Sequence, residues 1–342
     1  MALFSKNYLR DVNFGIKLAD IQITRREIMR LVSFETKGQE RAGLVLSDGR
    51  VVDLYETALD LAATGQFPGG TAGCEALKTV PGIIAVCAAV LPSLRLIESE
   101  GEQGRGTLIE AGDYGLLAPI PRPYKNVFCV GRNYIDHVTE GYKARGSEIR
   151  VPEHPQFFSK PPTAVTGPHS DIPFDPKTMA RLDYEVELGV IIGMQGKDIP
   201  QESALDHVFG YTIINDLTAR DLQRKHDQWF KGKGLDFSCP MGPWIVHKDD
   251  IADPQDLAIS LSVNGEVRQQ ARTSQMIFDL KRIISDLSQG MTLEVGDIIA
   301  TGTPSGVGYA MASPSFLSPG DVVRCEIECI GAIENRIGVT QR

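Results

Sequence analysis

LDYEVELGVIIG, residues 182–193, combines two patterns. In its first half, a period of two places Asp183, Glu185 and Glu187 on one face of a strand and apolar residues on the other. In its second half, GVIIG is apolar on both faces, which indicates a strand that enters an interior. A lone E-x-E is usually the solvated face of a strand, but carboxylates side by side in an interior repel each other unless a cation lies between them. The segment therefore predicts a buried strand with an acidic site at its start.

A third carboxylate, Asp216, follows the apolar strand pattern YTIIN at residues 211–215. Its alternative role is that of a helix N-cap, because backbone N–H groups at the start of a helix lack partners. Three oxygen ligands without Cys or His suit magnesium, manganese or calcium better than zinc. We expect Glu185, Glu187 and Asp216 to bind one Mg²⁺ or Mn²⁺ ion, with Ca²⁺ as an alternative occupant in crystals.

His137 and Glu140 form an H-x-x-E pair in the segment NVFCVGRNYIDHVTEGY. On a helix the two side chains lie one turn apart on the same face. The glutamate would then orient the imidazole as a general base. By itself the motif is more often a surface contact, so its significance depends on its surroundings.

Two loop segments carry candidate anion contacts. Lys233 lies in the Gly-flanked loop KGKG, where a lysine is usually solvated. TGTPSGVG, residues 301–308, lacks the Gly-Lys-Ser/Thr ending of a P-loop. It could still present backbone N–H groups and the Thr303 hydroxyl to an anion.

Composition places the chain among globular proteins. Of 342 residues, 42% are hydrophobic and 23% are charged, and the net charge is -9. This acidity argues against a nucleic-acid partner and requires a site for an anionic small molecule to supply its own positive charge. Six cysteines without a C-x-x-C pair indicate reduced thiols rather than a zinc site or a disulfide framework. With neither a membrane-length apolar run nor a secretory signal recognised, we expect a cytoplasmic protein without a membrane partner.

Turn signals divide the chain into three parts. Residues 1–28 form an extension without an assigned role, and residues 29–118 are expected to form a small α+β domain that begins as a meander of short strands. The Pro-rich stretch LLAPIPRPYK leads into a larger, β-rich domain over residues 119–342. Helical patterns in that larger domain are few, notably at about 217–225 and 277–287.

Five motifs occur in order between residues 119 and 342: GRNYIDH, YEVELGVIIG, NDLTARDLQ, KGKGLDFSCPMGPWIV and GDIIATGTPSGVG. Together they resemble the fumarylacetoacetate hydrolase family. The resemblance implies an α+β, β-rich fold, in which a mixed β-roll or sandwich catalytic domain follows a small N-terminal α+β domain. It also implies a homodimer.

The resemblance assigns roles to named residues. Glu185, Glu187 and Asp216 match the family's metal ligands, and His137 with Glu140 matches its catalytic dyad. A catalytic role for Lys233 is also implied. Substrate contacts are implied for four further residues: Arg132, Tyr134, Gln223 and Thr303.

These features predict a divalent-metal-dependent hydrolase that cleaves a C–C bond in an acylpyruvate-like substrate, a small anionic 2-oxo acid. A divalent ion would stabilise the departing carbon as an enolate, while His137 activates water and Lys233 with Gln223 stabilises the oxyanion. One alternative is a decarboxylase, tautomerase or isomerase of a 2-oxo diacid such as oxaloacetate. Another is a non-catalytic, metal-stabilised binding module.

Overall fold

The structure, a computed structural model, describes residues 28–67 and 73–339. The predicted N-terminal extension therefore lies outside the described residues except for Ile28, and its role stays unassigned.

A large mixed sheet runs through most of the molecule. Among the described residues it contains twelve strands. In spatial order its main path is β4 (Leu108–Ile109), β3 (Val51–Asp53), β2 (Gln39–Val45), β1 (Arg30–Thr36), β14 (Cys239–His247), β12 (Val208–Asn215), β11 (Val186–Ile192), β17 (Ile298–Ala300), β6 (Val127–Gly131) and β7 (Gln156–Lys160), while β5 (Gly115–Leu116) pairs with β1 and β8 (Val165–Thr166) with β14.

A second sheet covers one face of the first. Its order is β16 (Glu266–Arg272), β15 (Ala258–Val263), β18 (Val322–Ile327), β19 (Gly331–Val339) and β9 (Ile172–Phe174). Buried side chains from both sheets, among them Leu188 of β11 and Leu261 of β15, share one hydrophobic core. This packing confirms the predicted β-rich α+β fold with a sandwich-like catalytic part.

Strand β11 is buried along its whole length. Leu188 and Val190 point into the core between the sheets, whereas Ile191 belongs to a second core on the opposite side. GVIIG is apolar on both faces because both faces of the strand are covered. Glu187 shares the face of Ile191, so the acidic start of the strand is enclosed as well.

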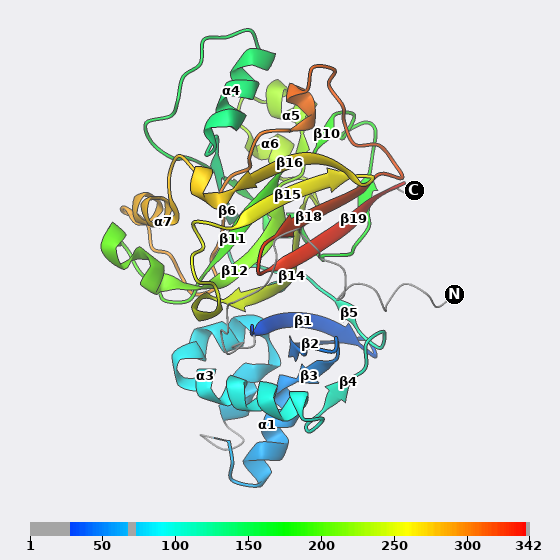
Figure 1. Ribbon diagram of the computed structural model, residues 1–342, viewed down its shortest axis with the longest axis vertical. Coiled ribbons are helices and arrows are strands. Elements are labelled where there is room, and N and C mark those ends of the chain that lie inside the picture. Colours follow the sequence, from blue (N-terminus) through cyan, green and yellow to red (C-terminus); the bar gives the residue numbers. More distant parts are fainter. Residues whose placement is uncertain (1–27, 68–72, 340–342) are drawn as a thin grey trace, which may run out of the picture.

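The N-terminal part carries α1 (Leu54–Ala63) and α3 (Val80–Glu102), which begin at the caps Asp53 and Thr79. By length and composition α3 could cross a membrane, but a soluble core helix passes the same test. Its side chains Ile83, Ile84 and Leu94 are buried in the second core. Strand β1 pairs with β14, so the predicted small and large domains share one sheet (Figure 1).

The remaining helical elements lie mostly in the larger part. The α-helices are α4 (Ile135–Ala144), α5 (Arg220–Lys225), α6 (Phe230–Lys233) and α7 (Leu280–Ser288), and the 3-10 turns are η1 (Glu75–Lys78), η2 (Pro162–Ala164), η3 (Gln201–His207), η4 (Lys248–Asp250), η5 (Thr273–Gln275) and η6 (Gly308–Ala310). Helices α5 and α7 lie within or beside the two predicted helical segments. Helices α4, α5 and α6 gather at the end of the sandwich remote from α1 and α3 (Figure 1). The short pair β10 (Leu182–Asp183) and β13 (Thr218–Ala219) lies at the same end.

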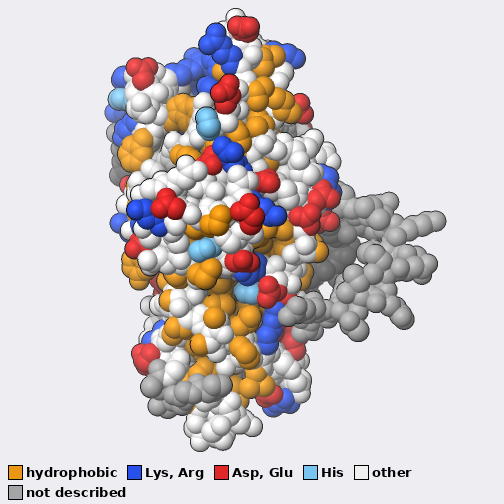
Figure 2. All heavy atoms as spheres, turned by 90° about the vertical axis from the view of Figure 1, so that its left-hand side faces the viewer, with side chains coloured by type: hydrophobic (Ala, Val, Ile, Leu, Met, Phe, Trp, Pro, Cys, Tyr) orange, Lys and Arg blue, Asp and Glu red, His pale blue; other side chains and the backbone are white. Residues whose placement is uncertain are grey.

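On the face in Figure 2, Lys and Arg side chains are interspersed with Asp and Glu. All six cysteines are free, in agreement with the prediction of reduced thiols.

Candidate active site

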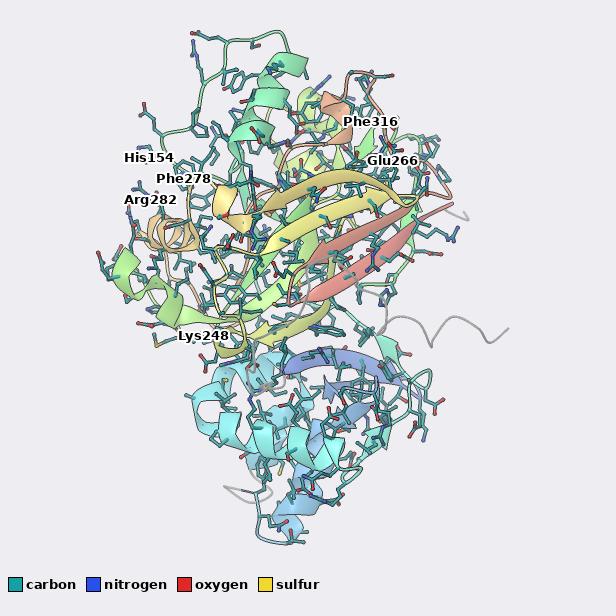
Figure 3. The ribbon with its side chains drawn as sticks, in the orientation of Figure 1. His154, Lys248, Glu266, Phe278, Arg282 and Phe316 are labelled. Carbon is teal, nitrogen blue, oxygen red and sulfur yellow. The ribbon has the colours of Figure 1, made fainter. Side chains whose placement is uncertain are left out.

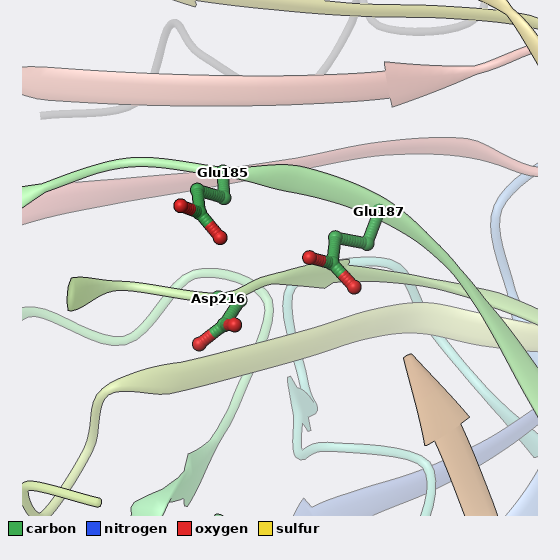
Figure 4. Close-up of side chains that lie close together, drawn as sticks. All are labelled: Glu185, Glu187 and Asp216. Atoms are coloured by element: carbon green, nitrogen blue, oxygen red, sulfur yellow. The ribbon is translucent and has the colours of Figure 1, made fainter. Parts of the chain in front are cut away.

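Three carboxylates converge where β11 begins and β12 ends. Glu185 and Glu187 flank the first residue of β11, and Asp216 follows β12 directly. Antiparallel pairing brings the segments together, because Val186 lies opposite Asn215 and the Asp216 N–H donates to the Glu185 carbonyl at 2.8 Å. One carboxylate oxygen from each of the three lies within 4.8 Å of the other two, and all three side chains are buried. Figure 4 shows them directed into the same space.

Buried cations partner two of the three carboxylates. Lys233 Nζ donates to Glu185 Oε2 and to Asp216 Oδ2, both at 2.6 Å. Arg220 Nη2 donates to the other Glu185 oxygen at 2.6 Å, and Lys160 Nζ donates to Asp216 Oδ1 at 2.7 Å. Burial alone would raise the pKa of Glu185, but Lys233 and Arg220 outweigh it and lower that pKa to about 2.

Glu187 is the exception. Among the described residues it has no salt-bridge partner, and its Oε2 accepts a 2.8 Å hydrogen bond from the Gly302 N–H. Burial, together with the charges of Asp216 and Glu185, raises its pKa well above the usual range. The cluster is therefore short of positive charge beside Glu187.

A hard divalent cation fits this donor set, since all three ligands are carboxylates and one has no cationic partner. The Lys233 ammonium already contacts two of the three carboxylates. A divalent ion that took oxygens from all three would either share these two carboxylates with the ammonium or displace it. Sequence reasoning placed Lys233 beside the substrate, whereas the structure places it among the predicted ligands as well as in the cavity wall.

The predicted dyad forms on α4. His137 Nδ1 lies 2.8 Å from Glu140 Oε1. An ionised carboxylate only accepts, so Nδ1 carries the proton in this pair and Nε2 is left basic. The other Glu140 oxygen accepts from the Gly306 N–H at 2.8 Å, which fixes the glutamate. His137 lines the same cavity as Glu185 and Glu187.

Three backbone N–H groups of the loop TGTPSGVG are taken up by carboxylates and so do not face a ligand. These carboxylates are buried or half-buried: Glu187 accepts from Gly302, Glu140 from Gly306, and Asp183 from Gly308 at 2.8 Å. Gly306 has a φ of 106°, and an added side chain would collide with the Arg268 carbonyl, so the loop requires glycine there. Acidic side chains thus hold the loop in place, and the Thr303 hydroxyl remains for a ligand.

A cavity of about 280 Å³ opens beside the carboxylates. Four residues with a predicted substrate-binding or catalytic role line it: Arg132, Gln223, Lys233 and Thr303. Tyr134 is absent from this lining: its side chain is buried and its hydroxyl has no hydrogen-bond partner among the described residues. Further cationic and aromatic side chains complete the wall, namely Arg145, Arg220, Arg224, Phe158, Trp229 and Tyr309. The cavity is small and strongly cationic on one side, which suits a compact anion.

Arg132 has a distinctive position at this cavity. Its backbone is in the left-handed region with a φ of 57°, which is uncommon for a residue other than glycine. Its guanidinium lies over the rings of Tyr142 and Trp229, each at 5.5 Å from the centroid. In the part of the chain that the structure describes, no carboxylate forms an ion pair with it, so its charge faces the cavity uncompensated.

Sequence reasoning missed three supporting residues. Asp183 accepts from Arg220 Nε at 2.8 Å while it holds the loop, and its place on the face of Glu185 was the available signal. Arg220 lies four residues after Asp216 in NDLTARDLQ, where its proximity to a ligand could have suggested its role. Lys160 lies far from the ligands in sequence, and SKPP gives no sign that its lysine is completely buried.

Comparisons with known proteins show the family to which this chain belongs. The family profile described as fumarylacetoacetate (FAA) hydrolase C-terminal matches residues 126–338. An oxaloacetate tautomerase, YisK of Bacillus subtilis (strain 168), is 42% identical over 318 residues, which cover 91% of this chain and 100% of the relative. A solved fumarylacetoacetate hydrolase from Exiguobacterium antarcticum is 38% identical with a TM-score of 0.72, and covers 91% of this chain and 100% of its own.

A second solved structure bears on the metal. Maleylpyruvate hydrolase from Sphingobium sp. SYK-6, in complex with a manganese(II) ion and pyruvate, is 29% identical with a TM-score of 0.68. The match covers 92% of this chain and 100% of that protein. Together with the acidic triad, this neighbour indicates a divalent-metal site.

Proposed function

We propose that this chain, which belongs to the fumarylacetoacetate hydrolase family, is a divalent-metal-dependent tautomerase of a small 2-oxo diacid such as oxaloacetate. The observation that supports this most is a general-base dyad, His137 with Glu140, in the wall of a small cationic cavity that also contains Glu185 and Glu187. The Bacillus subtilis relative is an oxaloacetate tautomerase, which favours this activity over the hydrolysis predicted from the sequence.

Glu185, Glu187 and Asp216 are the residues that would hold the ion, either Mg²⁺ or Mn²⁺. When bound, such an ion would polarise the 2-oxo-carboxylate group and make the neighbouring carbon more acidic. The cations of the cavity, Arg132 among them, would bind the two carboxylates of the substrate.

His137 is the residue positioned to move the proton. From the keto form, Nε2 would remove a proton from C3, the C2=C3 double bond would form, and the resulting imidazolium would return that proton to O2. Glu140 would stabilise the imidazolium that results, since it accepts from Nδ1. The reaction is an isomerisation, so it consumes no water and requires no other reactant.

Three assays run side by side test this proposal. The purified enzyme with Mn²⁺ receives oxaloacetate, and enol–keto interconversion is followed by ultraviolet absorbance while carbon dioxide release is measured separately. A parallel reaction receives an acylpyruvate and is assayed for pyruvate. Fast interconversion that exceeds both other rates supports the tautomerase, and a His137→Asn variant should lose about a hundredfold or more of it. Interconversion no faster than without enzyme contradicts the proposal.

Acylpyruvate hydrolysis is the second candidate. It is favoured by the maleylpyruvate hydrolase neighbour and needs the same dyad to activate water. Pyruvate release from an acylpyruvate in the third assay would establish it. A non-catalytic binding module predicts instead that none of the three reactions is accelerated, while Mn²⁺ still raises Tm. The predicted homodimer and cytoplasmic location stay predictions.

A further inference from the structure

Gln269 is a polar side chain that the reaction scheme does not use. It lies on β16, the strand that begins at Glu266, which is labelled in Figure 3. Its neighbours Arg268 and Gln270 are partly or fully exposed, whereas Gln269 has no exposed surface. A fully buried amide is costly unless each of its polar groups has a partner.

All the hydrogen-bonding groups of this amide are engaged. The Val186 N–H donates to Oε1 at 3.0 Å. Nε2 donates to Thr303 Oγ1 and to the Pro304 carbonyl, both at 2.8 Å. The orientation of the amide is fixed by its partners, because a backbone N–H only donates and a backbone carbonyl only accepts. If the amide oxygen and nitrogen were exchanged, two donors would face each other at Val186 and two acceptors at Pro304.

The fixed amide determines the direction of the Thr303 hydroxyl. Oγ1 must accept from Gln269, so its own hydrogen has to point elsewhere. Among the described residues no acceptor takes that hydrogen, although the Thr303 side chain is buried and lines the cavity. A buried donor without a partner is unfavourable, and a ligand oxygen would satisfy it.

We infer that Gln269 is a positioning residue that makes Thr303 a hydrogen-bond donor to an acceptor oxygen of the substrate. This inference rests on the proposed function, since it takes the ligand to be an anionic 2-oxo acid. A donating Thr303 hydroxyl favours a ligand with a carboxylate, enolate or carbonyl oxygen at this position. It disfavours a ligand hydroxyl that would itself have to donate there. Gln269 never touches the substrate and acts through Thr303.

A double-mutant cycle on ligand affinity tests the inference. Binding of oxalate, a planar dianion, is measured by calorimetry at saturating Mn²⁺ for wild type, Thr303→Val, Gln269→Met and the double variant. Loss of a hydrogen bond to a charged oxygen should weaken oxalate roughly tenfold to a hundredfold in Thr303→Val. Thr303→Ser should bind oxalate like wild type. Because Gln269 acts through Thr303, Gln269→Met should weaken oxalate in the wild-type background but by less than about twofold in the Thr303→Val background.

Controls separate positioning from a general loss of structure. Gln270→Met changes the exposed neighbour on the same strand and should leave oxalate affinity unchanged. Tm and Mn²⁺ affinity are measured for every variant. If Gln269→Met fails to fold, Gln269→Glu keeps an acceptor for Val186. Its oxalate affinity relative to wild type should fall as pH rises, because an ionised carboxylate cannot donate to Thr303.

Additive effects of the two substitutions would overturn the inference, as would unchanged oxalate affinity in Gln269→Met or in Thr303→Val. Failure of wild type to bind oxalate would overturn it too. The proposed function is judged by oxaloacetate interconversion, a different measurement, so the two failures are distinguishable. An enzyme that couples Gln269 to Thr303 in oxalate binding but does not interconvert oxaloacetate would refute the function and keep the inference.

Discussion

The ammonium of Lys233 lies 2.6 Å from a carboxylate oxygen of Asp216, a predicted metal ligand. Burial would lower the pKa of Lys233, but the charges of Asp216 and Glu185 raise it above its usual range, so the lysine stays protonated. We expect a divalent ion and this ammonium to compete for these carboxylates, because both are positively charged. Lys233 supplies the charge that holds the carboxylates together when no ion is bound.

Lys233→Met should reveal that competition. Without metal, two buried carboxylates lose a partner, and the variant should be destabilised by about 3–5 kcal/mol. Addition of Mn²⁺ should then raise its Tm by more than it raises that of wild type, because the ion replaces the missing charge. Lys231→Met, an exposed lysine of the same helix, is the control and should behave like wild type. Equal Tm gains in Lys233→Met and wild type would show that lysine and metal do not compete.

Glu187→Gln should have the opposite effect on the metal-free protein. Glu187 has no salt-bridge partner in the described structure, and Asp216 and Glu185 disfavour its ionised form, so a neutral amide in its place removes no stabilising ion pair. The amide oxygen can still accept from Gly302. We expect Tm without metal to stay level or rise, while Mn²⁺ affinity falls at least about a hundredfold. Calorimetric titration with Mn²⁺ and thermal unfolding of the same samples measure both. Unchanged Mn²⁺ affinity would remove Glu187 from the ligand set.

Lys160→Met tests how much the buried lysine behind the site contributes to stability. Lys160 is completely buried and donates to Asp216 Oδ1, to the Leu217 carbonyl at 3.1 Å and to the Lys233 carbonyl. Its removal leaves a buried charge and two carbonyls without this donor, which should cost about 3–5 kcal/mol of the free energy of unfolding. Urea unfolding measures this cost, again with Lys231→Met as the control. A loss below about 1 kcal/mol would mean that water replaces the lysine.

The sequence predicted the carboxylates of this site better than their partners. Glu185 and Glu187 share a face because a strand has a period of two, and Asp216 directly follows the next strand, so antiparallel pairing alone brings them together. Lys160 and Gln269 could not be found in this way. Each reaches the site from a distant strand, β7 or β16, and which distant strands meet is decided by the packing of the two sheets rather than by any local pattern.

The domain boundary illustrates the same limit. Short apolar runs correctly indicated the strands β1 to β3, but nothing local showed that β1 would pair with β14 across more than 200 residues, as Leu31 does with Ile245. In the Pro-rich stretch, Ala118 and Ile120 are buried. Strand β1 is an inner strand of the sheet, and the packing of the whole sheet rather than a local pattern decides that β14 is its neighbour.

Stability should fall as pH falls below about 6.5, with a contribution from His247. Burial lowers the pKa of His247 below its ordinary value of 6.5, and that of His169 likewise. Below that value the unfolded chain binds more protons than the folded chain, so each step down in pH favours unfolding. The effect is absent at higher pH, where the histidine is neutral in both states.

His247→Gln should flatten this dependence. We expect the wild-type free energy of unfolding, measured by urea at pH values from about 7.5 to 5.5, to fall more steeply than that of the variant. His154→Gln is the control, because His154 is exposed and lies on the outside near Arg282 of α7 (Figure 3). The difference between the two slopes measures the contribution of the histidine. A variant that is as steep as wild type would assign the acid sensitivity to other groups.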